Sequence, residues 1–170
     1  MAIKQVGQAG FGDGWLAPGA GVNMQLERLD ALVKWYRFEK LVSHLRDGAG
    51  PGRPGYPALL LVKALLLQAM YGLSDRELEE ALSDRLSFRR FVGLSLADAV
   101  PDHTVLNRFR GRLLAEGIET KLFAELDRQL DKAGVMLKRG TMLDATLIPA
   151  VTAPPRDRGG HQRSTLDPDA

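Results

Sequence analysis

The segment Ala58–Tyr71 constrains the fold most, because it is apolar on nearly every side of a helix. Pro57 precedes it and Gly72 follows it, and such residues commonly begin and end helices. A helix without a polar face must be covered by neighbours, so the segment predicts a central buried helix. It is shorter than the roughly 20 apolar residues that cross a bilayer. We therefore expect a cytoplasmic protein without a membrane segment.

Amphipathic patterns on both sides of this segment predict further helices. Asn23 is a candidate N-cap, Ser74 and Glu77 fit a capping box, and Asp102 is a third candidate cap. Glycines at 117 and 134 mark later breaks. The expected helices are Met24 to Leu45, Ala58 to Tyr71, Ser74 to Leu82, Asp84 to Val92, Asp102 to Ala115, and Ile118 to Leu130.

The remaining segments predict the domain organisation. Residues 1–22 are glycine-rich and lack a sustained period, which indicates a flexible lead-in, and Asp47–Gly55 is a linker. Two short strands are expected at Val135–Leu137 and Thr141–Ile148. The boundaries are therefore 1–22 for the lead-in, 23–134 for a helical domain, 135–150 for the strands and 151–170 for a disordered tail. The fold class is mainly α.

Composition excludes several classes of site. The 170 residues contain no cysteine and three histidines, which rules out disulfide scaffolds and cysteine nucleophiles and disfavours a histidine-rich metal site. The formal net charge of +2 is too small for a polybasic nucleic-acid coat. The sequence pI of about 9.0 still permits a local basic face.

The helix expected at Asp102–Ala115 is the best candidate for contact with DNA. One face is apolar, and the other carries Thr104, Asn107, Arg108, Gly111 and Arg112. Arginine and asparagine are the side chains that pair with guanine and adenine edges in the major groove. The capped helix Ser74–Leu82 would brace it, as in a helix-turn-helix fold. Taken alone, however, the pattern more often marks a solvated helix face.

A second candidate contact lies on the helix Asp84–Val92, where Arg85, Arg89 and Arg90 are expected on the outside. The competing interpretation is ordinary surface charge, neutralised by the acidic residues that precede it, and the pattern favours that interpretation.

Asp144 lies inside the apolar, strand-like run Thr141–Ile148. A carboxylate there is costly unless it binds something, so Asp144 is a candidate Mg²⁺ ligand and catalytic residue. No second carboxylate follows on a neighbouring strand, and a turn or edge position is the alternative.

Five ordered segments resemble the N-terminal part of bacterial insertion-sequence transposases of the DDE type, close to the fifth insertion-sequence family. They are Gly55–Gln68, Tyr71–Leu82, Ser87–Leu94, Pro101–Arg110 and Lys138–Ile148, and the resemblance runs from about Met24 to Ala150.

This resemblance implies a helical DNA-binding domain, helix-turn-helix-like, that binds double-stranded DNA at the element's terminal inverted repeats. It also implies the first strands of an RNase H-like domain that uses three carboxylates and Mg²⁺, with Asp144 as the first. We expect the other two carboxylates beyond Ala170, so the chain would be a catalytically incomplete fragment. The C-terminal half of the transposase and a second copy of the chain are further candidate partners. The alternatives are a stand-alone repressor of transposition and an inactive pseudogene product.

Overall fold

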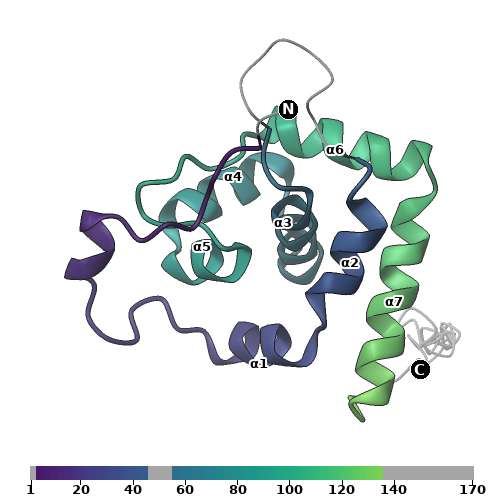
Figure 1. The fold of residues 1–170 in the computed structure, drawn as a ribbon, viewed down its shortest axis with the longest axis horizontal. Coiled ribbons are helices and arrows are strands. Elements are labelled where there is room, and N and C mark those ends of the chain that lie inside the picture. Colours follow the sequence, from purple (N-terminus) through teal and green to yellow (C-terminus); the bar gives the residue numbers. More distant parts are fainter. Residues whose placement is uncertain (1–2, 46–54, 136–170) are drawn as a thin grey trace, which may run out of the picture. The chain divides into compact units, whose positions relative to one another are not determined.

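Helix α3 (Ala58–Tyr71) runs through the middle of the helical domain, with α2, α4, α5 and α6 packed against it (Figure 1). Leu61, Ala64 and Leu67 are at most 2% exposed. Gly72 ends the helix in the left-handed conformation, with φ of 64°. The prediction of a central buried helix is confirmed.

The computed structural model describes residues 3–45 and 55–135. These residues form a 3₁₀ helix and seven α-helices, and the only β pairing among them is an isolated bridge between Ile3 and Gly55. The mainly helical class is therefore confirmed for this part of the chain. Besides α3, the elements are η1 (Phe11–Trp15), α1 (Met24–Leu32), α2 (Trp35–Val42), α4 (Asp75–Asp84), α5 (Leu86–Val92), α6 (His103–Ala115) and α7 (Ile118–Lys132).

The single helix expected from Met24 to Leu45 is wrong, because the chain breaks between α1 and α2. A continuous helix would point Leu26 and Phe38 in directions about 120° apart, yet both are buried. The break is held by the backbone N–H of Lys34, which donates to Gln129 Oε1 at 2.6 Å. One consequence is that Tyr36, which a continuous helix would place on the same face as Leu29, is 50% exposed.

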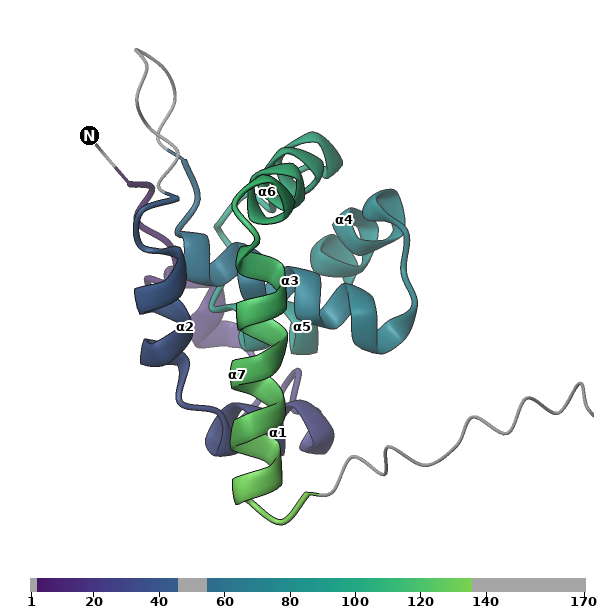
Figure 2. The ribbon, with the colours of Figure 1, turned by 90° about the vertical axis from the view of Figure 1, so that its right-hand side faces the viewer.

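The remaining helices surround α3 in two groups. Helices α4 and α5 pack on each other, and α4 also contacts α6. Helix α7 lies along α2 and contacts α6 at a steep angle, and α1 packs on α5 (Figure 2). The predicted capping box of α4 is confirmed, since Ser74 N donates to Glu77 Oε2 at 2.7 Å and Glu77 N to Ser74 Oγ at 3.3 Å. Helix α4 thus packs on both α5 and α6, and its own side chains close its first turn.

The lead-in segment contacts the helical domain at several points. Gly7 N donates to Asp98 Oδ2 at 2.7 Å, and Leu96 N donates to Asp13 Oδ1 at 3.1 Å. Gly21 has φ of 72°, and a Cβ there would lie 2.7 Å from the Cβ of Leu86. Residues 3–22 therefore lie against the first and last turns of α5 and the loop that follows it, although their sequence has no periodic pattern.

Several predictions concern residues outside the described part of the chain. Most of the expected linker falls in residues 46–54, and both expected strands, the tail and Asp144 fall almost entirely in residues 136–170. Among the described residues, no single helix is long and apolar enough to cross a membrane. Helices α3 and α4 reach that length and apolar character only when taken together, and they meet at a bend of 106°.

Candidate nucleic-acid interface

The first turn of α6 is anchored by Asp102 and by α4. Asp102 Oδ1 accepts a hydrogen bond from Val105 N at 2.8 Å, which confirms the predicted cap. Glu79 Oε2 of α4 accepts from both the backbone N and Nδ1 of His103, each at 2.9 Å. These backbone and side-chain hydrogen bonds lower the pKa of Glu79. The N-terminal end of α6 is thus tied to α4.

Helix α6 faces the core with the residues that the sequence predicts. Leu106, Phe109 and Leu113 are at most 2% exposed. The opposite face exposes Thr104, Asn107 and Arg108 along with Gly111, whereas Arg112 is half-buried and interacts with another group. The structure therefore brings the four predicted contact residues of α6 to one side of a single helix.

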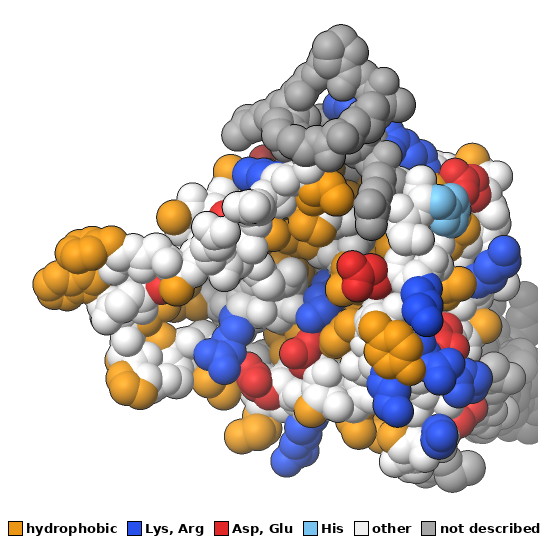
Figure 3. All heavy atoms as spheres, in the orientation of Figure 1, with side chains coloured by type: hydrophobic (Ala, Val, Ile, Leu, Met, Phe, Trp, Pro, Cys, Tyr) orange, Lys and Arg blue, Asp and Glu red, His pale blue; other side chains and the backbone are white. Residues whose placement is uncertain are grey.

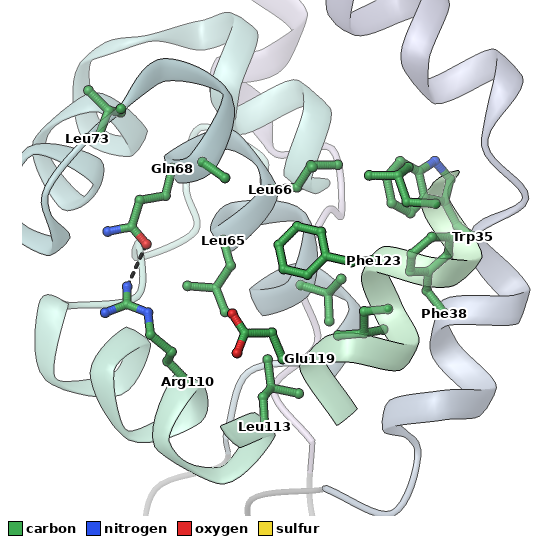
Figure 4. A pocket seen from close by; sticks show the side chains of 15 residues that line it. Trp35, Phe38, Leu65, Leu66, Gln68, Leu73, Arg110, Leu113, Glu119 and Phe123 are labelled. Carbon is green, nitrogen blue, oxygen red and sulfur yellow. Dashed lines mark hydrogen bonds between the residues drawn. The ribbon is translucent and has the colours of Figure 1, made fainter. Parts of the chain in front are cut away.

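The middle of α6 is fixed by Arg110, which the sequence analysis does not assign. Its guanidinium bonds both carboxylate oxygens of Asp75, at 3.2 Å for one and closer for the other, and donates to Gln68 Oε1 at 2.5 Å (Figure 4). Gln68 in turn donates to Asp75 at 2.7 Å. The hydrogen bond from Arg110 is the largest cause that lowers the pKa of Asp75, and Asn107 contributes a smaller one. The expected bracing of α6 by the helix at Ser74–Leu82 is therefore present.

The surface of α4 beside α6 is acidic. A shallow hollow between these helices is lined by Arg76, Glu79, Glu80, Ser83, Asp84 and His103. The three carboxylates of this hollow outnumber its cationic groups, which are Arg76 and, when protonated, His103. This side of α4 would therefore repel a phosphate backbone. Anionic ligands are therefore disfavoured on this side of α4.

Arg89 does not lie on the outside, and that prediction is wrong. Its side chain is buried, with the residue only 7% exposed, under the loop that follows α5. The guanidinium donates to the carbonyl oxygens of Leu82, Ser95, Leu96 and Asp98 at 2.5–3.3 Å. The loop carbonyls have no strand or helix to satisfy them, so they take a buried cation instead. Arg90 is exposed as predicted, and its Nε donates to Glu27 at 2.7 Å.

An apolar groove of about 350 Å³ lies between α2, α3, α6 and α7. Phe123 and Leu65 lie at its centre in Figure 4, and Glu119 and Arg110 supply its charged groups. Apolar carbon lines most of it, with no nucleophile–base pair among the residues that line it. The groove has the character of incompletely filled core.

The predicted metal ligand Asp144 lies outside the described residues. Within residues 3–45 and 55–135, no group of three or more histidine, aspartate or glutamate side chains is placed to hold a metal ion. The role of Asp144 therefore stays a prediction.

Comparison with known proteins gives one family match. The model of the transposase domain DUF772 matches residues 21–112, which span α1 to most of α6. No solved structure matches the chain. The matched range contains the central helix α3, the brace α4 and the candidate contact residues Thr104, Asn107, Arg108 and Arg112. Because this match covers more than half of the 170 residues, the chain belongs to the DUF772 transposase-domain family and is a transposase-related protein.

Proposed function

We propose that the helical domain binds double-stranded DNA at the terminal inverted repeats of an insertion sequence, with α6 as the helix that reads bases. One observation carries this proposal: α6 exposes Thr104, Asn107 and Arg108 on one face while Arg110 fastens the same helix to α3 and α4. A helix that reads base edges must be both exposed and rigidly positioned, because each bidentate contact needs fixed geometry.

The chemistry of this face suits the major groove. Arg108 can donate two hydrogen bonds to the O6 and N7 of guanine, and Asn107 can pair with adenine. Helix α6 has no acidic residue, so its exposed face carries no charge that would oppose phosphate. Gly111 lies on the same face and leaves room for close approach of the backbone.

The role of α4 in this proposal differs from that of the first helix in a helix-turn-helix. That helix crosses the DNA backbone, so it must tolerate phosphate. Helix α4 instead presents Glu79, Glu80 and Asp84 beside α6. We infer that DNA approaches α6 over Arg108, away from α4, so that Asn107, which also bonds Asp75, lies at the edge of the contact. Helix α4 would then act as an internal brace.

The catalytic part of the proposal rests on the resemblance to DDE transposases. Such enzymes cut and join DNA with three carboxylates and Mg²⁺, and Asp144 corresponds to the first of them. By this resemblance, Asp144 and two further carboxylates would hold the Mg²⁺ ions, which would supply activation of the attacking hydroxyl and stabilisation of the leaving oxygen. The helical domain would position the DNA end for that chemistry.

The experiment is a fluorescence-anisotropy titration with a duplex of the terminal repeats that flank the gene and with a scrambled duplex. Arg108→Ala should weaken binding to the repeat by about 1–3 kcal/mol and should reduce the preference over scrambled DNA. Arg28→Ala is the matched control, because it removes one exposed arginine from α1. Equal binding of the parent and Arg108→Ala proteins to both duplexes would rule out α6 as the reading helix.

A further inference from the structure

We propose that the exposed face shared by α2 and α7 is a second DNA-binding surface, which holds phosphates and does not read bases. It consists of Tyr36, Arg37 and Lys40 of α2 and Arg128 of α7, and we call it the Tyr36 surface. The inference rests on the proposed function, in which the domain binds double-stranded DNA. It adds a surface that lies on other helices than α6.

Two cations lie beside one exposed tyrosine, and a third is linked to them through Glu125. The Arg37 guanidinium carbon lies 5.6 Å from the centroid of the Tyr36 ring, and Lys40 Nζ lies 5.7 Å from it. Arg37 Nε also donates to Tyr36 Oη at 3.2 Å. Arg128 joins this group through Glu125, whose carboxylate lies against both Arg128 and Arg37. Figure 3 shows lysine and arginine side chains gathered over α2 and α7.

The carboxylate of Glu125 contacts both Arg37 and Arg128. Its carboxylate accepts from Arg128 Nη2 at 2.6 Å and Nε at 2.9 Å, and it lies 3.7 Å from Arg37 Nε. The Glu125 side chain is 16% exposed, whereas Arg37 and Arg128 are 44% and 48% exposed. The hydrogen bond from Arg128 is the largest cause that lowers the pKa of Glu125. The carboxylate of Glu125 is thus charged and largely buried, while the two arginines that it contacts remain exposed to solvent.

The side of this cluster that faces solvent carries more positive than negative charge. Arg37 and Arg128 both lie against the single carboxylate of Glu125, so two positive charges share one negative charge, and Lys40 adds a further cation beside the Tyr36 ring. Glu39 lies on α2 as well, but it lines a different groove with Ile3 and Tyr56. Like charges gathered within a few ångströms repel one another, and an external anion would relieve that repulsion.

A phosphate backbone is the anion that fits these donors best. Arginine, lysine and tyrosine are among the side chains that most often donate to phosphate oxygens, and such contacts fix the register of a protein on DNA without carrying sequence information. The Tyr36 surface offers all three types side by side. The sequence pattern does not predict this surface, because one continuous helix from Met24 to Leu45 would place Tyr36 on the same face as Leu29.

The experiment compares the parent chain with the double variant Arg37→Gln/Lys40→Gln in binding titrations at several salt concentrations. We expect affinity to fall by a similar factor for the repeat and for scrambled DNA. The slope of log affinity against log salt should shrink by about 0.9 for each phosphate that the variant no longer neutralises. Arg28→Gln on α1 removes a comparable exposed charge and should leave the slope unchanged. Arg37→Lys keeps the charge and should keep more of the slope than Arg37→Gln, which a purely structural role would not predict.

The outcomes separate this inference from the proposed function. An unchanged slope in the double variant, with a melting temperature like that of the parent, would overturn the Tyr36 surface even if Arg108→Ala abolishes the preference for the repeat. Conversely, a parent chain without preference for the repeat would count against α6, while a reduced slope in the double variant would still support the Tyr36 surface. Loss of repeat binding alone, with scrambled DNA bound as before, would contradict phosphate binding at this surface.

Discussion

Helices α5 and α6 look alike in sequence and differ in what their arginines do. Each is short and amphipathic, and each carries arginine between buried phenylalanine or leucine residues. Arg89 of α5 is buried and donates to carbonyls of the loop that follows it. Arg108 of α6 is exposed. Whether an arginine on a helix is structural or available for binding therefore depends on whether another segment of the chain covers it.

The loop between α5 and α6 makes this difference. Gly93 ends α5 with φ of 85°, and the chain then folds back over the helix. Asp98 fixes the loop by accepting hydrogen bonds from Ser95 N at 2.8 Å and Gly7 N at 2.7 Å. Burial raises the pKa of Asp98, but these backbone hydrogen bonds lower it further, so the net shift is downward. The loop and the lead-in together cover Arg89, and nothing comparable covers Arg108 among the described residues.

The largest expected effect is on the buried arginine. Arg89→Ala should lower the free energy of unfolding by about 3–5 kcal/mol, because several buried carbonyl groups lose their donor and each costs about 1–3 kcal/mol when left unsatisfied. Urea unfolding followed by circular dichroism measures this. Arg90→Ala is the control at the next position; its exposed pair with Glu27 should contribute less than about 1 kcal/mol. Equal losses in the two variants would break the comparison between buried and exposed arginines.

An intermediate effect is expected from the brace behind α6. Asp75→Asn should lower the free energy of unfolding by about 1–3 kcal/mol at neutral pH, because a charged hydrogen-bonded group is lost. The folded-state pKa of Asp75 is lowered, chiefly by Arg110. Its contribution is therefore fully present above the unfolded-state pKa of about 3.9 and disappears as the pH falls through the folded-state value.

Unfolding of the parent and of Asp75→Asn at pH 7 and at several lower pH values tests this brace. The difference between the two proteins should shrink as the pH falls below about 4, where the unfolded parent chain takes up a proton at Asp75, and should vanish below the folded-state pKa, where folded Asp75 is protonated too. A difference that stays constant down to about pH 2 would mean that the Arg110 contact does not stabilise the domain through the charge of Asp75.

The smallest expected effect on stability is at the candidate contact face. Arg108→Ala should change the free energy of unfolding by no more than about 0.5 kcal/mol, because the side chain is exposed. The same urea titration measures it beside Arg89→Ala. A decrease of more than about 2 kcal/mol would show that Arg108 is structural like Arg89, and would remove the basis for assigning it to DNA.

Local signals in the sequence were sufficient for much of the helical domain. The caps at Asn23, Ser74 and Asp102 are confirmed because each depends on one side chain bonding backbone groups two or three residues away. The bounds of α3 follow in the same way from Pro57 and from Gly72 in the left-handed conformation. Such interactions involve only neighbours along the chain, so a pattern can reveal them.

The sequence by itself thus determined the mainly helical class, the central helix α3, the buried face of α6 and the resemblance to transposases. Only the tertiary structure decided which charged residues are available. Arg89 is buried by a loop, Arg110 is bound by Asp75 across 35 positions of sequence, and Tyr36 is exposed because the chain breaks before α2. Each depends on a contact between residues distant in sequence, and helical periodicity carries no information about such partners.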